Sequence, residues 1–399
     1  MDSRKIIYER FIKPFENKTS RDVGVELEFP IVNTSGGDTD VKFVSEIAEF
    51  LEKHGFSCVL FGEGGEKLFM ENECGDCLSF DNSYNNFEFS LNHCDNLCEL
   101  HGRFEKYFEL ASGFFSQGGH RLASRGTNPN FNNLSVNHAP FSTYNMVQNY
   151  LHTYMGEHCY PDFPAFMSSV QTHLDIQKDK LPFAYTLFAR LDFVRGILFS
   201  NSPDFNGEGY RIFRDYLWEK SGFGRCPNIT GAVDESFETT DDIISFFLKK
   251  GLFNRIRNGK YEIFEPILIE DYFKRDDARA EDIECFLSFR NVEITCRGTL
   301  EVRSDCTQKE GRHFAPPAFN LGVSERLEEV KARLDEFFKT NDITLSNSQL
   351  REIVSTGKDL SLIANQKEIE SLCGDLTAIA RDGLVARNKG EENLLITNV

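Results

Sequence analysis

Apolar and polar residues alternate along several stretches of the chain. Within residues 23–32 an apolar side chain occupies every second position, and Gly24, Glu26 and Glu28 lie between them. A period of two predicts a strand with one buried face. Further strand-like segments lie at residues 57–62, 86–92, 168–176, 260–268 and 285–303, and Asn258-Gly259 is a hairpin turn signal before one of them.

Other stretches carry apolar residues three or four positions apart, which predicts helices. Residues 40–55 form one such stretch, which Asp40 can cap and Gly55 can end. Helices are also predicted at 96–117, 143–155, 182–199, 240–250, 322–339 and 366–387. Clusters of Asn, Pro, Gly and Ser predict loops at a functional site for 200–236, and 388–399 reads as a short extended or frayed end.

Strand and helix signals are mixed from end to end, without an internal repeat or a low-complexity linker. This pattern favours an α+β fold built as one unit over residues 1–399, with a helical C-terminal portion at 320–399.

Four of the predicted strands carry acidic or imidazole side chains on the face opposite their apolar face: Glu26 and Glu28 on the first, Glu88 on the second, His173 and Asp175 on the third, and Glu301 with Arg303 on the fourth. These could be ordinary solvated faces of an antiparallel sheet. Glu is disfavoured in strands, however, and Lys, its usual partner there, is missing from all four faces.

If the four faces converge, their charges need cations. Two carboxylates ~4 Å apart repel by roughly 4 kcal/mol at an effective dielectric constant near 20. Hard oxygen ligands with one imidazole suit Mg²⁺ or Mn²⁺. Such ions would bridge the phosphates of ATP, and Arg303 could hold the moving phosphoryl group.

The composition narrows the possible partners. The net charge is −19, so the surface repels nucleic-acid phosphates and anionic lipid, and neither is expected as a partner. No apolar run has signal-peptide length or approaches the ~20 residues of a membrane span. These observations favour a cytoplasmic protein whose partners are small molecules.

Eleven cysteines, an odd number, favour free thiols over a disulfide framework. Cys74-x-x-Cys77 and Cys94-x-x-x-Cys98 could instead form a zinc site or a redox switch, although the two pairs need not meet in the fold.

Six short motifs resemble, in family order, those of the glutamate–cysteine ligase (γ-glutamylcysteine synthetase) family, in the type shared by plants and many bacteria. They are VGVELEF at 23–29, the SFD and FEFS pair at 79–81 and 87–90, VQTHLD at 170–175, LFSNSP at 198–203, GTLEVRS at 298–304 and ARDGL at 380–384. Each motif is weak alone, but six in register are a strong signal.

The resemblance implies a funnel of antiparallel strands related to the glutamine synthetase catalytic fold, with helices packed outside. It also implies the reaction of glutathione biosynthesis in which ATP phosphorylates the γ-carboxylate of glutamate and the amine of cysteine displaces phosphate. An acyl phosphate removes the charge that opposes attack on a carboxylate and supplies a leaving group.

By the same resemblance, the metal ligands would be Glu26, Glu28, Glu88, His173 and Glu301, with Asp81 as a secondary candidate. Arg303, beside Glu301, would act on the phosphoryl group. Arg214 and Trp218 match an R-x-x-x-W pattern that contacts glutamate, and a planar guanidinium suits its α-carboxylate. Arg214 could equally be a surface helix charge, and Trp218 a core aromatic. Arg225 matches a loop Arg that meets substrate or nucleotide, and Tyr150 lies in a segment similar to another family motif.

Two departures leave the acceptor amine open. Ser304-Asp305-Cys306-Thr307-Gln308 replaces a Gly-rich continuation of the late strand, and Gln148 stands where Arg is expected. The competing hypotheses are therefore a γ-glutamyl ligase that uses another amine, and a non-catalytic, regulatory or protein-modifying member of the family.

Overall fold

The computed structural model describes residues 1–18, 22–204, 207 and 209–397. Its main feature is a nine-stranded sheet in the order β12-β13-β7-β1-β5-β4-β3-β2, with β6 beside β1 and every pair antiparallel. The strands are β1 Val23–Asn33, β2 Phe56–Phe61, β3 Lys67–Asn72, β4 Cys77–Phe80, β5 Asn86–Cys94, β6 His120–Leu122, β7 Ser169–Leu174, β12 Val292–Ile294 and β13 Leu300–Cys306.

Two small sheets and a set of helices complete the described part. β9 Gly251–Arg257 pairs with β10 Lys260–Leu268, and β8 Thr230–Gly231 runs parallel to β11 Phe289–Arg290. The α-helices are α1 Ser3–Ile7, α2 Val41–Ser45, α3 Ile47–Glu52, α4 Leu97–Gln117, α5 Ser142–Thr153, α6 Leu181–Arg190, α7 Asp192–Phe199, α8 Phe213–Glu219, α9 Thr240–Leu248, α10 Ile269–Tyr272, α11 Ala315–Ser324, α12 Leu327–Thr340, α13 Asn347–Ser355 and α14 Gln366–Arg387.

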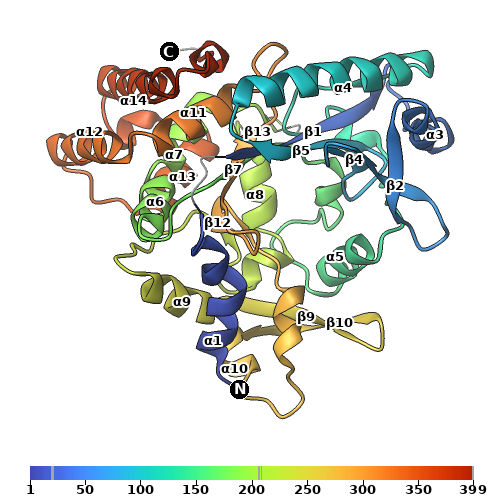
Figure 1. Ribbon diagram of the computed structural model, residues 1–399, viewed down its shortest axis with the longest axis horizontal. Helices are drawn as coiled ribbons and strands as arrows, with labels where there is room; N and C mark the ends of the chain where they lie inside the picture. Colours follow the sequence, from blue (N-terminus) through green and yellow to red (C-terminus); the bar gives the residue numbers. More distant parts are fainter. Residues whose placement is uncertain (19–21, 205–206, 208, 398–399) are drawn as a thin grey trace.

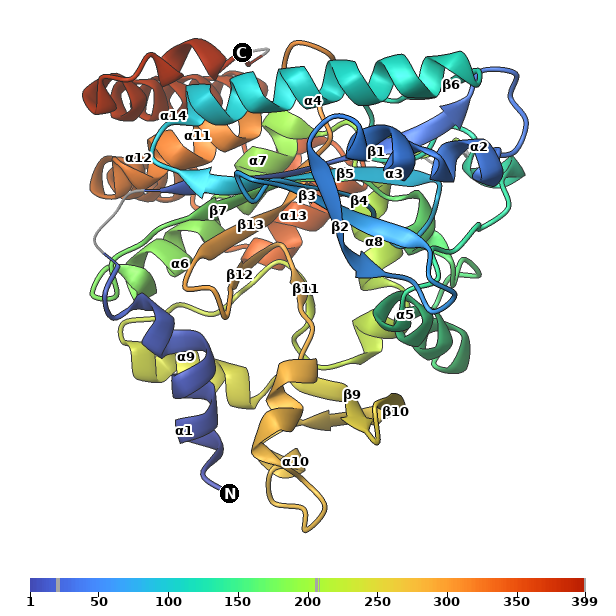
Figure 2. The same cartoon turned by 45° about the vertical axis from the view of Figure 1, so that its right-hand side comes forward.

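The helices cover the main sheet unequally. α4, α11 and α14 lie along one side of it, and both views place them together there (Figures 1 and 2). A smaller part, which contains α1, α9, α10 and the β9–β10 hairpin, lies on the other side (Figure 2). The side of the sheet away from α4 therefore faces this smaller part of the molecule.

The alternation in β1 explains how this sheet is anchored. Val25, Leu27 and Phe29 are fully buried. Phe29 and Phe89 of β5 both pack on Phe104 of α4, with ring centroids 5.8 and 5.4 Å away. Burying a side chain of this size contributes roughly 1.5–3 kcal/mol. The apolar face is thus fixed under α4, which leaves the intervening Glu residues on the opposite face.

Glycines allow α11 and α14 to cross in close contact. A Cβ atom at Gly383 would lie 2.3 Å from the carbonyl oxygen of Gly322, and one at Gly322 would lie 2.1 Å from that of Ala380. The crossing holds α11 against β7, so the C-terminal motif that contains Gly383 supports the sheet from behind.

Most predicted elements are present, with shifts that have local causes. The mixed architecture with a large antiparallel sheet is confirmed, whereas kinship with the glutamine synthetase fold stays a prediction. Asp40 caps α2 as predicted, but the helix expected over 40–55 is interrupted at Glu46. The Asn258-Gly259 turn is confirmed, with positive φ at both residues. Residues 200–236, expected as loops, contain α8 as well, and residues 205, 206 and 208 lie outside the described part.

Near the C-terminus, residues 391–394 form a short 3-10 helix and Leu395 is buried, so this part of the tail is packed and not frayed; residues 398–399 lie outside the described part. Among the described residues, no helix combines the length and the apolar character that crossing a membrane requires.

Replacing Gly383 with Ala should force α11 and α14 apart and lower the free energy of unfolding by about 1–3 kcal/mol. Gly113→Ala in α4 is the matched control, because nothing lies within 4 Å of the place that its Cβ atom would occupy, and helix propensity should stabilise it by up to about 1 kcal/mol. Denaturant unfolding of both variants measures these changes in the free energy of unfolding. Equal stability of Gly383→Ala and the unmodified chain would contradict the close crossing.

Candidate active site

The acidic side chains predicted to converge do lie on one face of the sheet. Glu28 of β1 is directly opposite Glu88 of β5, and His173 of β7 is directly opposite Glu301 of β13. Directly opposite residues in antiparallel strands project to the same face with Cβ atoms ~5 Å apart. The register of the sheet therefore assembles the cluster from four strands.

Glu26, His173 and Glu301 form the tightest group. Their ligand atoms all lie within 4.8 Å of one another. His173 Nε2 lies 3.1 Å from Glu26 Oε1 and 3.6 Å from Glu301 Oε1, and its Nδ1 lies 3.1 Å from the hydroxyl of Thr299. Two carboxylates and an imidazole oriented by a second hydrogen bond suit a divalent cation.

Glu28, Glu88 and Asp81 continue the cluster along the same face. Glu28 accepts hydrogen bonds from the backbone N–H of Ser169 at 2.9 Å and from Gln171 Nε2 at 2.7 Å. Ser90 donates to Glu88 at 2.6 Å, and the side chain of Asn82 donates to Asp81 at 2.9 Å. Neutral donors satisfy part of these carboxylates but leave their negative charges uncompensated.

The pKa values reflect this crowding. Burial, and then the charge of Glu28, raises the pKa of Asp81 to about 7. Burial, and then the charges of Glu26 and Asp81, raises the pKa of Glu88 well above its usual range. Burial also raises the pKa of Glu28, although Arg214 opposes the shift. Carboxyls that cannot all ionise together need a cation, so the donor set fits Mg²⁺ or Mn²⁺.

Glu26 behaves differently because it has positive neighbours. Burial alone would raise its pKa, but His173, Arg297 and Arg303 outweigh this effect and bring the pKa to about 2. Glu26 is therefore ionised at neutral pH.

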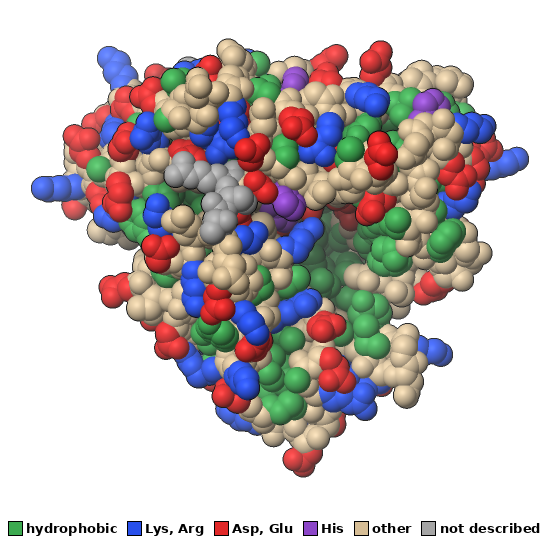
Figure 3. All heavy atoms as spheres, viewed as in Figure 1, with side chains coloured by type: hydrophobic (Ala, Val, Ile, Leu, Met, Phe, Trp, Pro, Cys, Tyr) green, Lys and Arg blue, Asp and Glu red, His purple; other side chains and the backbone are tan. Residues whose placement is uncertain are grey.

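A cavity of about 250 Å³ opens over the cluster. Figure 3 shows the recess between the upper and lower parts of the molecule, with hydrophobic side chains inside it. Glu26, Glu28, Asp81 and Glu88 lie at one end, and the wall also includes Arg303, Arg214, Trp218, Glu219, Gly231 and Phe289. A second cavity, of about 500 Å³, is lined by Glu26 and His173 together with Lys18 and Arg297.

The two arginines predicted to bind anions border the first cavity. Arg303 is paired with Glu301, and Arg214 donates a 3.4 Å hydrogen bond to the carbonyl oxygen of Arg303. Arg214 is buried in the cavity wall, so it is not a surface helix charge. Two guanidinium groups beside an acidic cluster suit a ligand that carries carboxylate or phosphate.

Trp218 combines both interpretations made from the sequence. Its ring stacks on Phe289 with centroids 4.5 Å apart, as a packed aromatic does, and it also lines the cavity.

The structure places Tyr150 and Arg225 away from this cavity. Tyr150 is fully buried between Phe223 and Phe253, and its hydroxyl donates to the carbonyl oxygen of Gly222. It packs in a core and does not line the cavity, and its predicted contact with substrate stays a prediction. Arg225 is exposed, donates to the carbonyl oxygen of Met155 and borders a separate surface cavity. Its contact with substrate or nucleotide stays a prediction.

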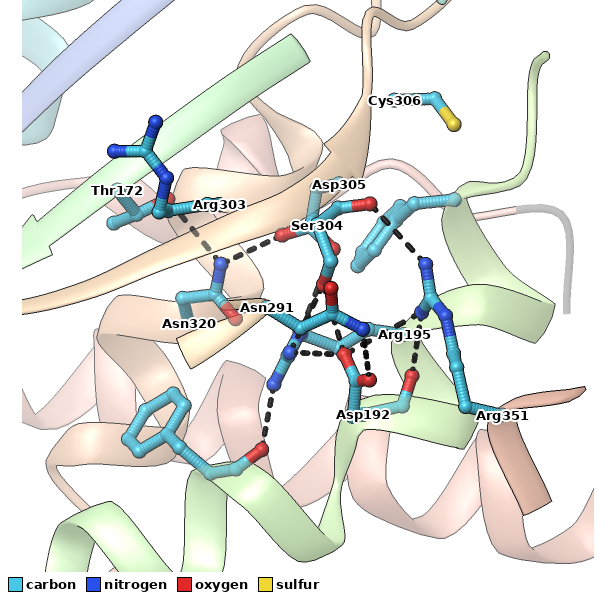
Figure 4. Close-up of polar contacts among 12 residues, drawn as sticks. Thr172, Asp192, Arg195, Asn291, Arg303, Ser304, Asp305, Cys306, Asn320 and Arg351 are labelled. Carbon is cyan, nitrogen blue, oxygen red and sulfur yellow. Dashed lines mark hydrogen bonds and ion pairs between the residues drawn. The ribbon is translucent and has the colours of Figure 1, made fainter. Parts of the chain in front are cut away.

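A buried polar network that the sequence motifs did not indicate holds β13 and α8 in place. Arg351 of α13 bonds Asp215 of α8 at 2.7 Å and the backbone oxygen of Asp192 of α7 at 2.8 Å. Asp192 also accepts a 2.8 Å bond from Ser304 of β13, next to Arg303, as Figure 4 shows. The network thus links the strand that carries Glu301 and Arg303 to the helix that carries Arg214.

This network also accounts for one departure from the family pattern. Ser304 and Asp305, in place of a Gly-rich segment, bond Asp192 and Asn320 (Figure 4). Gln148, the other departure, lies near Asp162 and is not part of the cavity wall.

The cysteines do not form a metal site within the described residues. All eleven are free thiols, and the one group there with metal-binding spacing is Glu26, His173 and Glu301. Burial, and then the charge of Glu88, raises the pKa of Cys77 to about 12, which disfavours its thiolate.

The acidic cluster and the two arginines beside it are thus suited to binding a divalent cation next to an anionic ligand. The chain belongs to the glutamate–cysteine ligase family 2 (GCS2), whose model matches residues 22–357. It is therefore a carboxylate–amine ligase. A search of the curated proteins found no match.

Three solved structures are similar to this one. Glutamate–cysteine ligase of Francisella tularensis in complex with AMP is 12% identical, with a TM-score of 0.49 over 96% of this chain and 83% of that one. A bifunctional glutathione synthetase of Pasteurella multocida is 11% identical, with a TM-score of 0.42 over 98% of this chain and 51% of that one. GmaS without ligand is 12% identical, with a TM-score of 0.35 over 98% of this chain and 73% of that one.

Mg²⁺ should raise the melting temperature by several degrees, because a ligand at ~100 times its Kd stabilises a protein by about 2.7 kcal/mol. Glu301→Gln should lose most of this shift, because it replaces one of the three ligand side chains with a neutral amide. Thermal melting with and without MgCl2, against NaCl at matched ionic strength, checks this. An equal shift in both proteins would contradict the cation site.

Arg351→Met should lower the free energy of unfolding by about 3–5 kcal/mol, because Asp215 would remain buried without its ion-pair partner and Asp192 would keep only Arg195. Lys358→Met is the matched control: it breaks an exposed pair with Glu352 and should cost no more than about 1 kcal/mol. Denaturant unfolding measures both. A loss in Arg351→Met as small as that of the control would contradict the supporting role of the network.

Proposed function

We propose that this chain is an ATP-dependent ligase that joins the γ-carboxylate of glutamate to the amine of L-cysteine through γ-glutamyl phosphate. The convergence of Glu26, His173 and Glu301 beside Arg303 supports this proposal most directly. Glutamate activation creates negative charge on phosphate oxygens, and a carboxylate cluster tolerates such a ligand only when cations lie between them.

Mg²⁺ or Mn²⁺ is the cofactor in this proposal. Glu26, His173 and Glu301 would hold it, with Glu28, Glu88 and Asp81 next to them. When bound, such an ion neutralises and orients the phosphates of ATP. The second cavity, which Glu26 and His173 also line, has the cationic side chains of Lys18 and Arg297 in its wall.

The remaining residues would bind and orient substrate. Arg303, between Glu301 and the cavity, is placed to pair with the transferred phosphoryl group. Arg214 of α8 would bind the α-carboxylate of glutamate, because a planar guanidinium pairs well with a carboxylate. Trp218, from the same helix, would form an apolar wall beside it. Since β1, β5, β7, α8 and β13 all contribute, we treat residues 1–399 as one catalytic unit.

Two alternatives share part of this evidence. A γ-glutamyl ligase that uses another amine would keep the same cluster, because the acceptor is not activated by phosphate. A non-catalytic or regulatory member would not need the buried carboxylates, whose repulsion costs stability, so their convergence disfavours it. Eleven free thiols agree with a cytoplasmic location.

Phosphate release from ATP should depend on glutamate and should be largest with L-cysteine in a panel of amines that includes alanine, 2-aminobutyrate, methylamine and ammonia. The physical reason is that the enzyme must hold both the amine and the small side chain of its acceptor. Product mass identifies the amide formed. Glu301→Ala is the control and should reduce turnover to background.

Turnover with another amine and none with cysteine would overturn the cysteine assignment and leave the ligase. Absence of ATP consumption with glutamate, Mg²⁺ and every amine would overturn the ligase itself. Wild-type rates in a folded Glu301→Ala variant would overturn the role of the cluster.

A further inference from the structure

Helix α8 places more charged side chains in the cavity wall than the R-x-x-x-W motif accounts for. Arg214, Asp215, Trp218 and Glu219 all lie in the cavity wall. Their spacing of one and four residues places them on one side of the helix. Arg214 and Trp218 already have roles in the proposed function, so the two carboxylates remain to be explained.

Glu219 is the cavity carboxylate that has no assigned partner. Of the six acidic residues in the wall, four belong to the cluster on the sheet, and Asp215 is bonded to Arg351. Within the described part of the chain, the carboxylate of Glu219 has no hydrogen bond or ion pair. The side chain is exposed to the cavity and lies against Gly231, where a Cβ atom would be 3.0 Å from its Oε1. Its carboxylate can therefore receive a cationic group of a ligand.

The surroundings of Glu219 also favour proton exchange. Enclosure by the protein, and then the charge of Asp215, raises the pKa of Glu219 to about 7. Arg351 of α13 and Arg290 of β11 act in the opposite direction, and Asp192 of α7 adds to the shift. A carboxyl that titrates near neutral pH is matched to accept a proton under working conditions.

The neighbouring wall suits a small, weakly polar acceptor. Trp218 and Phe289 stack beside Gly231, and Leu287 extends this apolar surface. The anionic groups of glutamate and phosphate have Arg214 and Arg303 instead. The cavity thus offers two arginines to the activated donor and, in Phe289 and Leu287, an apolar surface next to Trp218 for an amine with a short side chain.

We propose that Glu219 binds the ammonium group of the acceptor amino acid and removes one proton from it, so that the neutral amine can attack. This inference rests on the proposed ligase function and deepens it. The acceptor class is an α-amino acid with a short side chain. Its ammonium group is protonated at neutral pH, because the amine of a free amino acid loses its proton only in alkaline solution.

The step balances as follows. The ammonium group gives one proton to the carboxylate of Glu219 and becomes R–NH2. Its nitrogen lone pair forms the C–N bond at the γ-carbon of γ-glutamyl phosphate, and the C–O bond to the phosphoryl group breaks with its electron pair on oxygen. The second proton of the nitrogen passes to the departing phosphate, so the products are the amide and HPO4²⁻.

Hydroxylamine provides the test, because it is too weakly basic to carry a proton at neutral pH and attacks the same acyl phosphate. The full chain is assayed with ATP, glutamate and Mg²⁺, with either L-cysteine or hydroxylamine as acceptor; if the amine panel selects another amino acid, that one replaces cysteine. Glu219→Gln should lower the ratio of the amino-acid product to the hydroxamate about 100-fold. Glu157→Gln is the matched control: Glu157 is exposed, lies outside the wall of the large cavity and borders a smaller surface cavity that Glu219 also lines, so this substitution should leave the ratio as in wild type.

The pH dependence supplies a second readout. The deficit of Glu219→Gln with the amino acid should shrink as the pH rises into the alkaline range, because the amine then loses its proton to solvent. A deficit that stays the same at every pH would overturn proton removal by Glu219.

The outcomes separate this inference from the function on which it rests. If the wild-type chain makes no hydroxamate, the proposed activation of glutamate fails. If it does, but Glu219→Gln has the same product ratio as Glu157→Gln, Glu219 has no role toward the acceptor. An equal rise of the KM for glutamate with both acceptors would place Glu219 at the α-ammonium group of glutamate and overturn the inference.

Discussion

Mutual repulsion of carboxylates gathered on one face of a sheet is the constraint on which the rest of this site depends. The register puts Glu28 opposite Glu88, and Glu301 opposite His173. Like charges directly opposite one another destabilise a sheet. The raised pKa values of Glu88 and Asp81 show the cost in the absence of a counter-ion. A divalent cation bound on this face, as proposed, would relieve the repulsion and bring a phosphate ligand with it.

Two features stabilise the fold against this repulsion. One is the apolar packing of the buried face of the sheet, and the other is the buried polar network around Arg351. Aromatic side chains of β1, β5 and α4 fix the buried face of the sheet. Arg351 then ties α8 and β13 to the helices behind them through Asp215 and Asp192. Removing one member would leave buried charges without a partner. The network therefore fixes the position of the groups on β13 relative to those on α8.

Much of this arrangement could be predicted because it is encoded by local periodicity. The alternation in 23–32 specified the face on which Glu26 and Glu28 lie, and long periodic stretches predicted α4 and α14 closely. The convergence of Glu26, His173 and Glu301 followed from a shared pattern on separate strands. The short strands β3 and β4, which lack a long alternating pattern, were missed.

Contacts between residues far apart in sequence could not be found in this way. Arg351 meets Asp215 across 136 positions, and nothing in the residues near either one indicates the other. Tyr150 was placed by motif similarity, whereas its full burial depends on tertiary packing. Glu219 carries no local signal, since only the fold shows that its carboxylate faces the cavity without a partner.

Anomalous diffraction from crystals grown with MnCl2 and a non-hydrolysable ATP analogue would show directly whether the acidic cluster binds a divalent cation. We expect a manganese peak within coordination distance of the side chains of Glu26, His173 and Glu301, beside the phosphates of the analogue. A bound analogue whose manganese lies elsewhere, with these three side chains uncoordinated, would contradict this expectation.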